Sequence, residues 1–143
     1  TTVQAAAPDL IILAGFMRVL SAEFIAAFSG RIVNIHPSLL PAFRGLHAQA
    51  QALDAGVKFA GCTVHIVVPE VDGGPILAQA VVPVHGDDTV ESLSARILSC
   101  EHQLYPAVIE QLLLDRIQIS ADGRTTHAPE LRAADGALFS IKR

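Results

Sequence analysis

The feature that most constrains the fold is a strand–helix–strand pattern near the start of the chain. Leu10–Ala14 is a continuous apolar run rich in β-branched side chains, typical of a parallel strand covered on both faces. Ser21 is a candidate N-cap for a short helix over Ala22–Phe28, which Gly30 ends. Arg31–His36 predicts a second buried strand. This order predicts a βαβ unit with a right-handed crossover.

The middle of the chain predicts one more helix and an antiparallel pair of strands. Leu46–Ala55 has a helical pattern and is followed by Gly56. Gly61–Val68 and Ile76–Val84 both alternate between two faces, which favours pairing with each other. Together with the βαβ unit, these segments predict an α/β fold.

The last third predicts a long helix and a hairpin. Apolar side chains recur at helical spacing after the capping residues Asp87-Asp88-Thr89, and Pro106 should kink or restart that helix. Arg116–Ser120 and the following Asp122-Gly123 predict a strand and a hairpin turn. Ala128–Arg143 is a weakly patterned tail.

Length and composition favour a single domain over residues 1–143, since a chain of this size can bury one core. The net charge is −4 and basic residues do not cluster, which argues against nucleic-acid binding. No apolar run is long enough to span a membrane. Cys62 and Cys100 lack the spacing of a metal or redox motif, which favours a reduced, cytoplasmic compartment.

Asn34 and His36 are the first candidate functional residues. They share one face of the predicted strand, and Pro37 ends that strand directly after them. Ligands bind at the carboxyl ends of strands in open α/β sheets. A carboxamide beside an imidazole suits the stabilisation of an oxyanion together with proton transfer. The alternative is that His36 is a structural histidine.

Asp72 and Glu101 are the other candidates. Asp72 stands before Gly73-Gly74, so it is either a turn former or, if it meets His36, a carboxylate that fixes the imidazole's orientation. Glu101 falls on the apolar stripe of the long helix and is either a satisfied helix carboxylate or a ligand for sugar hydroxyls. The remaining histidines have no metal-ligand spacing: His47, His65, His85, His102 and His127.

Five segments, taken in order, resemble the folate-dependent formyltransferases, and among them the members that act on glycinamide ribonucleotide. They are LAGFMRVLS at Leu13–Ser21, NIHPSLLPAF at Asn34–Phe43, GCTVH at Gly61–His65, EVDGGPIL at Glu70–Leu77 and EHQLYP at Glu101–Pro106. The similarity extends from about Pro8 to Arg116. It implies a formyltransferase-like (Rossmann-like) mixed sheet flanked by helices.

The resemblance also implies a reaction: a formyl group passes from 10-formyltetrahydrofolate to the amine of glycinamide ribonucleotide in de novo purine biosynthesis, with no metal. Asn34 would hydrogen-bond the formyl oxygen, His36 would act with it, and Asp72 would hold His36. Residues expected at the folate are Met17, Arg18, Val19, Leu20, Asn34, Val68, Pro69, Glu70, Val71 and Asp72. Residues expected at the ribonucleotide are Leu98, Ser99, Cys100 and Glu101.

Two departures from the family pattern stand out. The family's first strands and its Gly-rich phosphate loop have no counterpart here, so we expect a chain truncated at its N-terminus relative to the family. Arg44 occupies a position where many relatives have proline.

Three alternatives to the transferase remain open, and the protein is expected to be a monomer or homodimer. A formyltetrahydrofolate deformylase would use water as acceptor, although Ser38 and Gly73-Gly74 favour the transferase. Transfer to initiator tRNA would require a basic extension. An inactive fragment would retain only the folate pocket.

Overall fold

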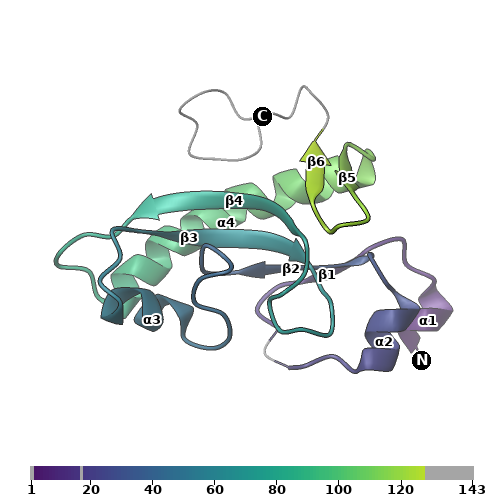
Figure 1. Cartoon of the computed structure of the whole chain (residues 1–143), viewed down its shortest axis with the longest axis horizontal. Helices are drawn as coiled ribbons and strands as arrows, with labels where there is room; N and C mark the ends of the chain where they lie inside the picture. The colour runs from purple at the N-terminus through teal and green to yellow at the C-terminus, as the bar shows by residue number, and fades with distance from the viewer. Residues whose placement is uncertain (1, 17, 128–143) are drawn as a thin grey trace.

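The computed structural model describes residues 2–16 and 18–127 of the chain (Figure 1). Met17 and the predicted tail Ala128–Arg143 lie outside the described residues. The elements, in chain order, are α1 (Thr2–Ala6), β1 (Ile11–Leu13), α2 (Ala22–Ala27), β2 (Ile32–His36), α3 (Ala48–Asp54), β3 (Phe59–Ile66), β4 (Ile76–Pro83), α4 (Val90–Leu113), β5 (Ile117–Ile119) and β6 (Thr125–His127).

The main sheet is mixed, as predicted, with the strand order β1-β2-β3-β4. β1 and β2 are parallel, whereas β2 with β3 and β3 with β4 are antiparallel. The register places Asn34 between Leu13 on β1 and His65 on β3. β5 and β6 form a separate hairpin, which confirms the turn predicted at Asp122-Gly123.

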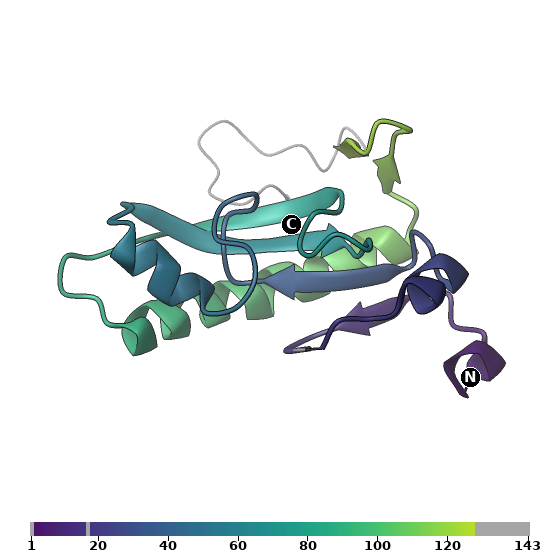
Figure 2. The same cartoon turned by 60° about the horizontal axis from the view of Figure 1, so that its bottom comes forward.

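The core lies between the sheet and α4, which runs along one face of it (Figures 1 and 2). The predicted helical spacing is confirmed, because Leu93, Ile97, Leu104 and Val108 are fully buried. Thr89 caps the helix with Ser92 in a reciprocal capping box. No helix among residues 2–16 and 18–127 is long and apolar enough to cross a membrane.

Two local expectations differ from the structure, and for Pro106 one of two alternatives is excluded. Ile12 is 46% exposed, so β1 is not covered on both faces. α3 begins at Ala48 rather than Leu46, because His47 has a left-handed backbone (φ 57°) that cannot be part of a right-handed helix. α4 continues through Pro106 without a restart. Pro106 is exposed, so water can satisfy the carbonyl that its missing N–H leaves free.

Candidate functional site

Two cavities meet at the carboxyl end of β2. The larger has a volume of about 660 Å³ and the smaller about 90 Å³. Residues from three separate segments line both cavities: Phe16, Val19, Asn34, Val71 and Asp72. A molecule in one cavity can therefore meet a molecule in the other at Asn34 and Asp72.

The position of Asn34 and His36 follows from the alternation of β2. Both side chains line the larger cavity, and Pro37 ends the strand beside them. Asn34 is half-buried, while His36 is buried, with 7% of its surface exposed. The predicted presentation of an amide and an imidazole at the end of a strand is thus what the structure contains.

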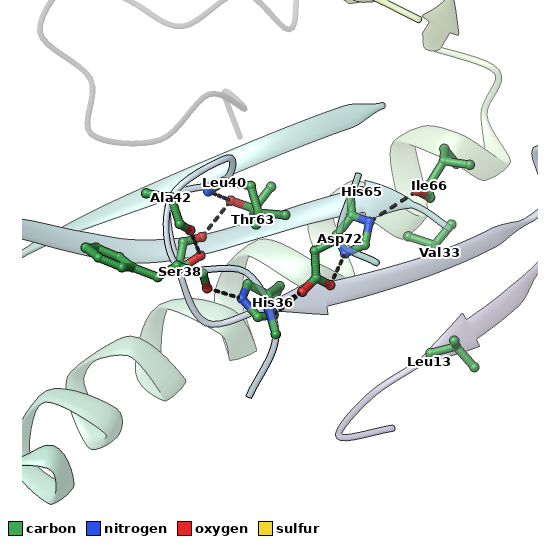
Figure 3. A network of polar contacts seen from close by, with 12 residues as sticks. Leu13, Val33, His36, Ser38, Leu40, Ala42, Thr63, His65, Ile66 and Asp72 are labelled. Carbon is green, nitrogen blue, oxygen red and sulfur yellow. Dashed lines mark hydrogen bonds and ion pairs between the residues drawn. The ribbon is translucent and has the colours of Figure 1, made fainter. Parts of the chain in front are cut away.

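Asp72 lies between two imidazole rings, those of His36 and His65 (Figure 3). Its Oδ2 is 3.4 Å from Nδ1 of His36, and its Oδ1 is 3.6 Å from Nε2 of His65. The backbone N–H of Gly45 donates a hydrogen bond to Oδ2 at 2.8 Å. The carboxylate therefore joins β2, β3 and the loop that follows β2.

The ring of His36 is oriented from both sides. Its Nε2 lies 2.9 Å from the backbone carbonyl oxygen of Phe43, and its Nδ1 faces Asp72. A carbonyl oxygen can only accept, so Nε2 is the donor in that contact. Both ring nitrogens face oxygen atoms, and an imidazolium can donate to both.

His65 is a site residue that the sequence analysis did not select. Its Nδ1 donates to the carbonyl oxygen of Ile66 at 3.1 Å, which leaves Nε2 unprotonated in the neutral ring. Among the described residues, this Nε2 is the buried side-chain nitrogen or oxygen that lacks a hydrogen-bond partner. Burial lowers the pKa of His65 below its usual value. The site thus retains an acceptor beside Asp72 that a bound N–H or O–H group can use.

The sequence contains only part of the signal for His65, because the register between two strands is not set locally. Arg31–His36 and Gly61–Val68 were both predicted to be strands, and pairing them places His65 opposite Asn34. The alternating patterns indicate only the pairing of Gly61–Val68 with Ile76–Val84, and the spacing of the other histidines bears only on metal binding. Within residues 2–16 and 18–127, no group of three or more His, Cys, Asp or Glu side chains could hold a metal ion.

The loop between β3 and β4 carries Asp72 and is held in close contact with β3. Asp72 adopts a left-handed backbone conformation (φ 50°), which Asp tolerates better than most residues. A Cβ atom on Gly74 would lie 1.8 Å from the carbonyl oxygen of Ile66, so only glycine fits there. Arg44, the departure from the family pattern, forms an ion pair with Glu70 of this loop at 2.7 Å.

The residues expected at the folate fall in three groups. All five residues of the loop segment line the smaller cavity: Val68, Pro69, Glu70, Val71 and Asp72. Val19 and Leu20 line it as well, whereas Arg18 is exposed outside its lining. Met17 lies outside the described residues.

Only two of the four residues expected at the ribonucleotide line the larger cavity. Leu98 and Glu101 line the larger cavity from α4. Ser99 is exposed outside that lining, and Cys100 packs against the core. Burial raises the pKa of Glu101 above its usual value. Within the predicted segment Leu98–Glu101, only the side of the helix that carries Leu98 and Glu101 reaches the cavity.

Comparison with known proteins points to one family. The chain matches the family described as formyl transferase over residues 1–109. It is similar to a phosphoribosylglycinamide formyltransferase of Escherichia coli (strain K12), with 47% identity over 113 residues. These residues make up 79% of this chain and 53% of that protein, so the chain spans about half the relative's length.

Solved structures agree in fold. The phosphoribosylglycinamide formyltransferase from Anaplasma phagocytophilum is 48% identical, with a TM-score of 0.87 over 90% of this chain and 63% of that one. A formyltetrahydrofolate deformylase from Pseudomonas syringae pv. tomato has a TM-score of 0.84 at 31% identity, over 89% of this chain and 42% of that one.

Proposed function

We propose, on the premise that this chain belongs to the formyl transferase family, that it transfers a formyl group from 10-formyltetrahydrofolate to the amine of glycinamide ribonucleotide in purine biosynthesis. The observation that supports this most directly is the meeting of two cavities at Asn34 and Asp72, with His36 beside them. A group transfer between two bound molecules requires such a junction, because the reacting atoms must be held about 3–3.5 Å apart.

We assign the smaller cavity to the pterin of the folate and the larger one to the ribonucleotide and the rest of the folate. The loop Val68–Asp72 lines the smaller cavity, and its backbone groups can pair with a flat heterocycle. Glu101 lines the larger cavity, and its carboxyl group can bind sugar hydroxyls. Residues 1–143 would act as one catalytic domain in a cytoplasmic protein.

In the proposed transfer, a bond forms between the substrate amine and the formyl carbon, and the bond from that carbon to the folate nitrogen breaks. The amine loses one proton and the folate nitrogen takes one up. The Asn34 carboxamide would donate to the formyl oxygen as negative charge develops on it, an effect typically of about 10²–10³ in rate. His36 would donate a hydrogen bond from Nε2 to the formyl group that is being transferred. For this, its present partner, the Phe43 carbonyl, has to be exchanged for the substrate. Asp72 would keep the ring in place from the other side.

The second candidate is hydrolysis of the formyl group, with water as the acceptor. The structural likeness to a formyltetrahydrofolate deformylase keeps this alternative open. Its identity to this chain is lower than that of the phosphoribosylglycinamide formyltransferase from Anaplasma phagocytophilum, 31% against 48%, which favours the transferase.

The experiment is an assay of formyl transfer in which formate release is followed in parallel. We expect formylated ribonucleotide and little formate. Formate released without ribonucleotide would identify a deformylase instead. Absence of both products would overturn the proposal in favour of an inactive chain that retains the folate pocket. His85→Ala, at an exposed histidine in the loop before α4, is the control variant and should keep the rate of the unmodified chain.

A further inference from the structure

Tyr105, the chain's only tyrosine, connects the two walls of the larger cavity. It lies on α4 and is 8% exposed. Its hydroxyl group contacts two backbone carbonyl oxygens, that of Leu13 at 2.5 Å and that of Val33 at 3.0 Å. Leu13 ends β1 and Val33 lies on the adjacent strand β2 (Figure 3). One side chain therefore joins α4 to both parallel strands.

The two residues whose carbonyl oxygens contact this hydroxyl are both neighbours of Asn34, which lines the larger cavity. Val33 directly precedes Asn34, and Leu13 is the register partner of Asn34. On α4, Glu101 lies one turn before Tyr105 and therefore on the same side of the helix. The hydroxyl thus bridges the element that carries Glu101 and the element that carries Asn34.

The contact is well suited to hold these elements at a constant distance. A phenol has one proton, so the two carbonyl oxygens share one donor and both are drawn toward the same point. Burial raises the pKa of Tyr105, which keeps the hydroxyl protonated at any working pH. β1 needs such support, since it has only three residues and Ile12 in its middle is exposed.

We propose that Tyr105 is a positioning residue whose hydroxyl group sets the separation between Glu101 on α4 and Asn34 on β2. It thereby holds the carboxyl group proposed to bind the sugar at a fixed distance from the site of formyl transfer. The roles of Glu101 and Asn34 in this statement rest on the proposed function. The bridge itself rests on the contacts of Tyr105 alone.

The test compares Tyr105→Phe, which removes only the hydroxyl, with Val108→Ala. Val108 lies on the same helix, is fully buried in the core cluster and is outside the lining of the larger cavity. Val108→Ala therefore reports what a general loss of core packing does. Amide hydrogen exchange should become faster at residues 11–15, 32–36 and 98–101 in Tyr105→Phe, but not selectively there in Val108→Ala. The same exchange pattern in both variants would overturn the inference.

A kinetic cycle tests the link to Glu101. We expect Tyr105→Phe to raise KM for glycinamide ribonucleotide about three- to tenfold, the effect of losing one buried hydrogen bond. Glu101→Gln should then raise KM less in the Tyr105→Phe background than in the unmodified chain, because the carboxyl group is already displaced. Additive effects, as expected for Val108→Ala with Glu101→Gln, would contradict a positioning role. If the unmodified chain shows no transfer, the proposed function fails, and hydrogen exchange alone decides the inference.

Discussion

At the scale of single residues, the site depends on the carboxylate of Asp72. It receives a backbone hydrogen bond from Gly45 and lies within 3.4 Å of His36 and 3.6 Å of His65. The hydrogen bond from Gly45 and the contact with His36 hold the carboxylate in one orientation, whereas His65 presents an unprotonated Nε2 to it. Its removal leaves two imidazoles without their common partner while the packed core remains untouched.

We therefore expect His36→Ala and Asp72→Ala to lower kcat for formyl transfer by roughly 10²–10⁴, the range of a positioned acid or base. Far-ultraviolet circular dichroism should remain that of the unmodified chain. Asp54→Ala, at an exposed aspartate that ends α3, is the control and should keep full activity. Turnover in either site variant equal to that of the control would refute the assignment.

The carboxylate of Glu101 is expected to favour ribonucleotide binding and, at neutral pH, to lower the stability of the folded protein. Burial raises the pKa of its carboxyl group, so the unfolded chain loses this proton at a lower pH than the folded protein does. Stability is therefore lost as pH rises from the ordinary glutamate pKa through the raised one. Glu101→Gln removes this loss and should raise Tm at pH 7, with the difference disappearing below about pH 4.

The same substitution should weaken ribonucleotide binding, with KM about 10- to 100-fold higher, because a charged hydrogen-bonding group is lost. Thermal melts at pH 4 and pH 7 would test the expected change in Tm, and steady-state kinetics at neutral pH would test the expected change in KM. A lower Tm for Glu101→Gln at pH 7 would show that the carboxylate is stabilised in the folded protein.

At the scale of elements, the loop between β3 and β4 is built around a close backbone approach. Gly74 packs against the carbonyl of Ile66, and the N–H of Ile66 donates to the carbonyl of Pro75 at 2.9 Å. The ion pair between Arg44 and Glu70 also joins this loop to the one after β2, but both side chains are largely exposed. Such exposed pairs contribute about 0–1 kcal/mol, so the glycine contact dominates.

Gly74→Ala should therefore displace the loop and with it Asp72. We expect the free energy of unfolding to fall by about 1–3 kcal/mol, as is typical of overpacking, and the folate Kd to rise. Gly86→Ala is the matched control, since a Cβ atom there would have no neighbour within 4 Å. Chemical denaturation and folate titration of both variants give the comparison. Equal stability of the two would contradict the role assigned to Gly74.

At the scale of the whole molecule, the pH dependence of stability includes opposite contributions from the half-buried Glu101 and the buried His65. Burial raises the pKa of Glu101, whereas it lowers the pKa of His65. Both groups line cavities of the proposed site, so part of the fold's sensitivity to pH lies in the ligand-binding region. The core between the sheet and α4 is largely apolar, and burial keeps its ionisable side chains, Cys62 and Tyr105, neutral by raising their pKa values.

For His65, the unfolded chain binds a proton near the ordinary histidine pKa of 6.5, while the buried ring does so only at lower pH. Stability is thus fully present above pH 6.5 and is lost as pH falls below it. His65→Asn should reduce the fall in Tm between pH 7.5 and pH 5, relative to the unmodified chain. Melting curves recorded across this range would test it, and parallel declines in the two proteins would contradict it.

Much of this protein was determined by the sequence itself, because the signals are local. The alternation of apolar side chains located β2, β3 and β4, the capping residues Ser21 and Thr89 started two helices, and Asp122-Gly123 made a hairpin. Asn34 and His36 could be paired on one face of a strand because side chains in a strand alternate with a period of two.

Other features were decided only by the tertiary structure, because they depend on strand register and helix packing between distant segments. The antiparallel register of β2 and β3 places His65 opposite Asn34, and the loop after β3 then brings Asp72 between His36 and His65. The rotation of α4 selects Leu98 and Glu101 for the cavity over the two residues between them. A single chain segment contains no information on which distant group it will face, so these contacts could not be predicted from local patterns.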